Sequence, residues 1–178
     1  MRENFTYGSV RGAAGNGSPY RDSRHPIEHV TSVPLPAGRE PRVALAVRVR
    51  MPSGDPLMIV NLHFDWIGDD RARFAQATQL AKYLDKLEMP LILLGDFNDR
   101  PGSRTLDLLG QDKLEAKKPA SDRFTFSSTD PRSEIDFIFA APPAVWKVRS
   151  TAVIDEPLAS DHRPVLAEIT IHAAGKND

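Results

Sequence analysis

The 178-residue chain has no cysteine, no long apolar run and almost no net charge, and each of these absences excludes a class of protein. Without cysteine there is no disulfide, no thiolate metal site and no cysteine nucleophile. No apolar run approaches the roughly 20 residues of a membrane-spanning helix, and the first residues lack the apolar stretch of a secretory signal. The formal net charge of -1 argues against a dedicated nucleic-acid binder, which is usually strongly basic, although a local basic groove stays open.

The composition is that of one globular domain, with 40% hydrophobic and 26% charged residues. A chain of this length fits a single domain and can bury a core without cross-links. We therefore expect one domain over residues 1–178. Its first segment, residues 1–26, is rich in Gly, Ser and Pro and should be loop, and its core should span residues 27–172.

Apolar patterns predict strands with helices between them. Residues 43–50 and 56–64 flank a Pro-Ser-Gly-Asp turn and predict a hairpin, in which Val43 and Leu45 share one face. Residues 91–94 are apolar throughout, which is typical of a central strand covered on both faces. Further strands are expected at 27–30, 135–139, 145–154 and 165–171, and helices after Asp69-Asp70 and over 101–109. The pattern is that of an α/β chain with a largely antiparallel sheet.

Polar clusters interrupt or end several of these apolar strands. They are Asn61-Leu62-His63, Gly95-Asp96-Phe97-Asn98, Glu134-Ile135-Asp136 and Ser160-Asp161-His162. Burying such groups costs several kcal/mol unless they are paired, hydrogen-bonded or bound to a metal. Because sites in layered α/β proteins gather at strand ends, we expect the clusters to converge on one rim.

The spacing within the clusters suggests chemistry. In extended backbone, Asp96 and Asn98 project to the same side and offer a carboxylate and an amide to one ligand. A histidine such as His162 that acts as a general base needs a carboxylate behind it, and Asp136 and Asp161 are both candidates. Each cluster taken alone also has a structural explanation, as a capped turn or a half-buried histidine.

Together, and in this order, the clusters resemble the motifs of the endonuclease/exonuclease/phosphatase family, which has the DNase I-like fold. The matching segments are Asn61-Leu62-His63-Phe64-Asp65 (N-x-H-x-D), Gly95-Asp96-Phe97-Asn98 (G-D-F-N), Ile135-Asp136-Phe137-Ile138-Phe139 (I-D-Y-I-F) and Ser160-Asp161-His162-Arg163-Pro164-Val165 (S-D-H-x-P-V). Weaker similarity is present at Tyr7-Gly8 and at residues 23–27. The resemblance implies a four-layered α/β sandwich that hydrolyses a phosphate ester with water.

The resemblance also implies a divalent metal ion, either Mg²⁺ or Mn²⁺. It further implies roles for the acidic residues of the motifs and for His162. His162, oriented by Asp136, would deprotonate the attacking water. Asp96 would help to position that water, and Asp161 would ligate the metal or lie beside it. Magnesium prefers oxygen ligands and keeps several waters, so a site with few protein carboxylates suffices.

The remaining motif residues would bind the substrate. By the same resemblance, His63 would donate to a phosphoryl oxygen with support from Asn61, and Asn98 would contact the phosphate. Phosphoryl transfer requires chiefly in-line positioning and charge neutralisation, which this set of groups and a divalent cation would supply.

One part of the family pattern has no counterpart here. Family members begin with a strand that carries a catalytic Asn, followed by a helix and a Gln-Glu pair whose Glu is a principal metal ligand. No segment matches these elements, and Glu3 is not assigned the role. We therefore expect an N-terminally truncated domain with exposed apolar surface and open strand edges, and a homo-oligomer would be one way to cover them.

Two functions of different kinds remain open. The chain is either a phosphoesterase or a catalytically incomplete domain that binds a phosphate ligand or serves as a scaffold. The expected partner is a phosphate ester, and nucleic acid is not favoured by the charge. Phe64, Trp66 and Ile67 would form an apolar lip for a lipid or aromatic group, or pack in the core, which is the commoner role. The compartment is open, with the cytoplasm as the default.

Overall fold

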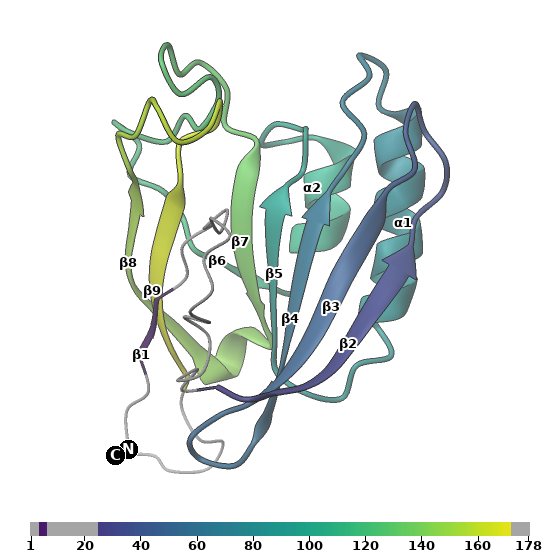
Figure 1. The fold of residues 1–178 in the computed structure, drawn as a ribbon, viewed down its shortest axis with the longest axis vertical. Helices are drawn as coiled ribbons and strands as arrows, with labels where there is room; N and C mark the ends of the chain where they lie inside the picture. Colours follow the sequence, from purple (N-terminus) through teal and green to yellow (C-terminus); the bar gives the residue numbers. More distant parts are fainter. Residues whose placement is uncertain (1–3, 7–24, 172–178) are drawn as a thin grey trace, which may run out of the picture.

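The described residues form two sheets of unequal width that face each other, with two helices on the outer face of the wider one (Figure 1). The structure is a computed structural model that describes residues 4–6 and 25–171. Most of the loop segment expected at residues 1–26, with Glu3, Tyr7 and Gly8, lies outside the described residues.

The wider sheet has six strands within the described residues and carries the polar motifs. Its order is β2 (Ile27–Pro34), β3 (Val43–Arg50), β4 (Pro56–His63), β5 (Leu91–Asp96), β7 (Asp136–Ala141) and β6 (Leu114–Glu115). The β4–β5 pair is parallel and the other pairs are antiparallel. The predicted hairpin, the central apolar strand and the largely antiparallel sheet are thus confirmed.

The narrower sheet has three strands in the part of the chain that the structure describes. Its order is β1 (Asn4–Thr6), β9 (Val165–Ile171) and β8 (Trp146–Val153). The helices α1 (Arg71–Leu84) and α2 (Arg104–Gly110) follow β4 and β5, and a 3-10 turn, η1 (Pro143–Val145), precedes β8. Both predicted helices are confirmed. The described residues thus build three layers, and none of their helices covers the outer face of the narrower sheet.

An apolar core lies on each side of the six-stranded sheet in the described structure. Under α1 and α2, Phe97 is fully buried and makes edge-to-face contacts with Phe64, Phe137 and Phe139, with ring centroids 5.6–5.8 Å apart. Between the sheets, a second core joins strand residues such as Ile92 to residues of β8 and β9. The wider sheet is therefore held from both faces.

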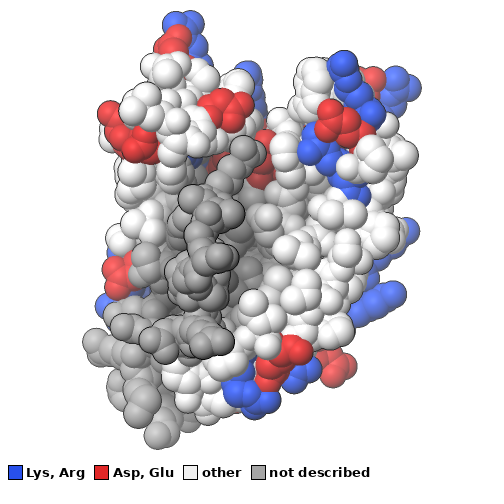
Figure 2. Space-filling view, viewed as in Figure 1, with Lys and Arg blue, Asp and Glu red and all other residues white. Residues whose placement is uncertain are grey.

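The alternation in β3 is confirmed, but the valine face is only partly buried. Ala44 and Ala46 are fully covered in the core under the helices, whereas Val43 and Leu45 are 51% and 41% exposed. The narrower sheet does not extend over this part of β2 and β3, and Figure 2 shows a largely uncharged surface there. Small alanines suit the helix side, where the layers pack closely. The exposed apolar surface expected from the sequence is present.

Gly95 allows β4 and β5 to approach at the end that carries the motifs. It has a φ of +136°, and a Cβ atom there would overlap the carbonyl oxygen of Leu62. Leu62 is its partner in the parallel ladder, and the next pair is His63 and Asp96. A glycine is therefore required for the register that brings these two side chains together.

We predict that Gly95→Ala lowers the free energy of unfolding by about 2–4 kcal/mol, because it combines an unfavourable φ with overlap of backbone atoms. Urea denaturation measures the change. Gly54→Ala is the matched control, since Gly54 also has a positive φ (+93°) but no atom within 4 Å of the added Cβ. Equal losses in the two variants would contradict a role for close strand approach.

Candidate active site

Three motif side chains lie in one row across three adjacent strands. His63 ends β4, Asp96 ends β5, and Asp136 begins the antiparallel β7, so all three stand at one end of the sheet. The ladder pairs His63 with Asp96 and Asp96 with Asp136. Residues paired in this way have Cβ atoms about 5 Å apart on the same face. Strand register alone therefore gathers an imidazole and two carboxylates.

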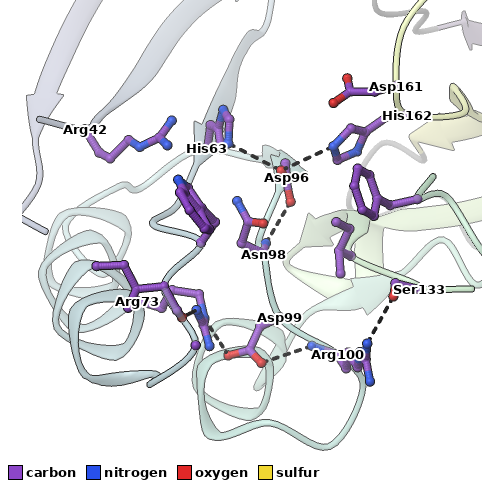
Figure 3. A pocket seen from close by; sticks show the side chains of 15 residues that line it. Arg42, His63, Arg73, Asp96, Asn98, Asp99, Arg100, Ser133, Asp161 and His162 are labelled. Atoms are coloured by element: carbon purple, nitrogen blue, oxygen red, sulfur yellow. Dashed lines mark hydrogen bonds and ion pairs between the residues drawn. The ribbon is translucent and has the colours of Figure 1, made fainter. Parts of the chain in front are cut away.

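His162 reaches this row from the loop between β8 and β9 in the other sheet. Its Nδ1 lies 2.9 Å from Asp136 Oδ2, and its Nε2 lies 3.8 Å from Asp96 Oδ2. His63 Nε2 lies 3.4 Å from the same Asp96 oxygen, so this carboxylate stands between two imidazoles (Figure 3). Of the two carboxylates considered for orienting His162, Asp136 is the one that bonds it. Asp161 accepts a hydrogen bond from the Ser160 hydroxyl at 3.3 Å.

The electrostatics of the row follow from crowding and burial. Burial, followed by the negative charge of Asp136, raises the pKa of Asp96 to about 6. At about 1.4 kcal/mol per pKa unit, the charged form of Asp96 is disfavoured by about 3 kcal/mol. The hydrogen bond that His162 donates to Asp136 raises the pKa of His162, whereas burial and the nearby Arg42 lower the pKa of His63. His162 therefore binds a proton more readily than His63 does.

The donor set fits a hard divalent cation. Asp96, Asp136 and His162 each offer a ligand atom, and these atoms lie within 4.8 Å of one another. Carboxylate oxygens are the ligands that Mg²⁺ prefers, and a cation would offset the unfavourable charge of Asp96. Asp161, the residue expected to ligate the metal, lies outside this group, although it is exposed and lines the same pocket.

The two asparagines of the motifs occupy different positions. Asn98 has a φ of +49°, so the backbone turns after β5 instead of staying extended as the spacing suggested. Its N–H donates to Asp96 Oδ1 at 2.7 Å, its side-chain amide donates to the Phe64 carbonyl at 3.0 Å, and it lines the pocket. Asn61 is exposed on the same face as His63, but it is not among the described residues that line the pocket.

Glu134, the remaining polar residue of the clusters, does not join the site. Its carboxylate is 10% exposed and lies 3.1 Å from the fully buried Lys118 ammonium, with Arg123 at 3.7 Å. Glu134 therefore forms a buried ion pair, which explains its place before an apolar strand without a catalytic role.

His63 and Asp96 of the row line a pocket of about 690 Å³, together with His162 from the other sheet. Figure 2 shows this end as a notch between two lobes, with acidic side chains inside it. Trp66 and Ile67 line the pocket, whereas Phe64 is wholly buried in the core. Phe64 is therefore excluded from the suggested apolar lip, for which Trp66 and Ile67 stay candidates.

Other lining residues carry no motif that the sequence could have revealed. Among them are Arg42, Arg100, Phe126 and Ser133. Arg42 lies before β3, its side chain is 13% exposed, and it pairs with Glu40 at 3.0 Å. Arg100 donates to the Ser133 hydroxyl at 3.1 Å (Figure 3). These residues come from loops, whose path across the pocket is fixed only by the folded structure.

Comparison with known proteins gives the family. The model of the endonuclease/exonuclease/phosphatase family matches residues 14–162, and the chain belongs to this family. No curated protein sequence matches the chain. Within the described residues, no helix is both long and apolar enough to cross a membrane.

Solved structures share the fold, which confirms the DNase I-like α/β sandwich. A family member from Bacteroides thetaiotaomicron matches with a TM-score of 0.75 and 21% identity over 86% of this chain and 69% of its own. A mannosyl-6-phosphatase from the same species matches with a TM-score of 0.72 and 22% identity, over 84% and 68% of the two chains. The human nocturnin catalytic domain, solved with a sulfate anion, matches with a TM-score of 0.72 and 19% identity, over 96% and 73%.

We predict that the two site histidines titrate on opposite sides of the ordinary pKa of 6.5 in metal-free protein, with His162 above it and His63 below it. NMR titration of the imidazole signals in EDTA measures both values. Asp136→Asn should lower the pKa of His162, because it removes the charged acceptor that stabilises the imidazolium. A His162 pKa that is unchanged in Asp136→Asn would contradict the assigned contact.

Proposed function

We propose that the chain is a divalent-metal-dependent phosphoesterase that hydrolyses a phosphodiester or phosphomonoester with an activated water. The observation that carries the proposal is the contact of His162 Nδ1 with Asp136 at 2.9 Å, beside a carboxylate that stands between two imidazoles. Family membership and the resemblance in fold to a mannosyl-6-phosphatase support the general chemistry.

In this proposal His162 is the general base. Asp136 occupies Nδ1, so Nε2 is the nitrogen left to accept a proton. Asp96 lies 3.8 Å from Nε2, so a water bound to this carboxylate lies within reach of the base. As the water oxygen bonds to phosphorus, the water proton passes to Nε2. The ester P–O bond breaks, and the leaving oxygen departs with the bonding electrons and takes up a proton from solvent.

The phosphate is bound from the other side of the row. His63, whose pKa is lowered, stays neutral and donates one N–H to a phosphoryl oxygen. The Asn98 amide has two hydrogens and donates one of them to the Phe64 carbonyl. The other hydrogen is left to bond the phosphate. Asn61, two residues before His63, remains a predicted supporting residue.

A divalent cation, Mg²⁺ or Mn²⁺, would be held by Asp96 and water, with Asp136 close by and Asp161 as a further candidate ligand. When bound, it neutralises charge on the phosphate and lowers the pKa of a bound water. Its charge would also favour neutral His162, the form that accepts a proton.

We predict that the chain hydrolyses bis-p-nitrophenyl phosphate or p-nitrophenyl phosphate with Mg²⁺ and that EDTA abolishes turnover. His162→Ala should lower kcat/KM by about 10²–10⁴-fold, the usual contribution of a general base. His29→Ala is the matched control, because His29 is an exposed histidine of β2 outside the pocket, and it should keep full activity.

Turnover that resists EDTA, or that survives His162→Ala, would refute the proposed mechanism. Saturable phosphate binding without turnover of either ester would instead support the alternative of a catalytically incomplete phosphate-binding domain.

A further inference from the structure

We propose that Trp66 is a stacking platform and that the organic group of the substrate carries a flat aromatic ring, an inference that rests on the proposed phosphoesterase function. Trp66 follows His63 by three residues, lines the same pocket and is 51% exposed. An indole ring that is half exposed to water lacks part of the favourable free energy of burying aromatic surface. A ligand that covers the ring on binding would gain this free energy.

One face of the Trp66 ring is already occupied. The guanidinium of Arg39 lies 4.7 Å from the ring centroid, within the range of a cation–π contact. Arg39 is not among the described residues that line the pocket, whereas Trp66 is. Arg39 therefore stacks on the indole from outside the pocket, and the ring surface left free is the one that a ligand can reach.

A buried polar network fixes both partners of this stack. The Asp65 carboxylate, 1% exposed, accepts hydrogen bonds from the Arg39 N–H at 2.6 Å and the Ile67 N–H at 2.9 Å. It thus holds the chain on either side of the indole. Gly38 makes room for it, since a Cβ at Gly38 would overlap the carboxylate.

Gln76 of α1 extends the network to the helix layer. It is fully buried, accepts the Asp65 N–H at 2.9 Å and donates to the Pro36 carbonyl at 3.1 Å. The loop that carries Arg39 and the loop that carries Trp66 are thereby tied to one rigid element. A ring held in this way loses little freedom when it binds, which is the property of a preorganised binding surface.

The rest of the pocket suits an aromatic phosphate ester. Phe126 lines it and is 38% exposed, with its ring centroid 5.0 Å from that of His162. Arg42 lies near enough to His63 to lower its pKa and adds positive charge for the phosphate. A ligand could place its phosphate beside the row and Arg42 and stack a flat ring on Trp66.

Equilibrium binding tests the inference. We expect adenosine 5′-monophosphate to bind the full chain with Mg²⁺ about tenfold or more tightly than ribose 5-phosphate, which has the same sugar phosphate but no ring to stack. Titration calorimetry measures both dissociation constants, with orthophosphate release followed in the same samples and the titrations repeated in EDTA. Trp66→Ala should bring the ratio of the two constants to about one, and Trp66→Phe should keep most of it.

Phe124→Ala is the matched control. Phe124 is 37% exposed and has Arg123 stacked 5.2 Å from its ring, but it lies outside the pocket lining, so the ratio should not change. Fluorescence gives a second readout in the unmodified protein, because the other tryptophan, Trp146, is buried: the adenine ligand should quench Trp66, and ribose 5-phosphate should not.

Equal binding of the two ligands, no saturable binding of the adenine ligand, or a ratio that survives Trp66→Ala would overturn the inference. Because the ratio is read from binding, it does not depend on turnover. If the phosphoesterase proposal fails, ring-selective binding persists without hydrolysis of any ester; if the ring inference fails, hydrolysis persists without ring selectivity.

Discussion

The proximity of two carboxylates, Asp96 and Asp136, is the constraint on which the rest of the site depends. The antiparallel ladder of β5 and β7 pairs them directly, and the Phe97 N–H continues that ladder with a 2.9 Å bond to the Ile135 carbonyl. Packed cores on both faces of the sheet prevent the strands from separating. The pair therefore cannot relax, and burial, followed by the negative charge of Asp136, raises the pKa of Asp96 to about 6. His162 offsets part of this repulsion through its bond to Asp136, and a divalent cation beside Asp96 would offset more.

Each layer of the fold supplies a different part of the site. The six-stranded sheet provides the row of His63, Asp96 and Asp136, and the narrower sheet delivers His162 on the loop between β8 and β9. The distance between the base and the row is therefore set by the core between the sheets, remote from the chemistry. The helix layer fixes the rim. Arg73 of α1 pairs with Asp99 at 3.4 Å and bonds the Ile67 carbonyl, while Gln76 holds the neighbouring loops.

Much of this arrangement could be predicted from the sequence, because strand periodicity and polar interruptions are local signals. The apolar run of β5 predicted a central strand, and the motifs at strand ends predicted that His63, Asp96, Asp136 and His162 would meet. Three kinds of detail required the structure. The turn at Asn98 replaces the expected extended backbone, because its N–H bonds the Asp96 carboxylate. Glu134 finds a buried lysine, which spacing cannot reveal. Loop residues such as Arg42 and Phe126 reach the pocket through contacts remote in sequence.

Stabilisation of the folded chain by Mg²⁺ is the most direct test of the proposal that the Asp96–Asp136 pair holds a divalent cation. Thermal unfolding with and without Mg²⁺ should show a rise in Tm at pH 8, where Asp96 is ionised, and a smaller rise at pH 5, below its pKa of about 6, where the proton competes with the cation. Asp96→Asn should remove most of the rise at pH 8. A rise that is equal at the two pH values, or that persists in Asp96→Asn, would contradict the claim.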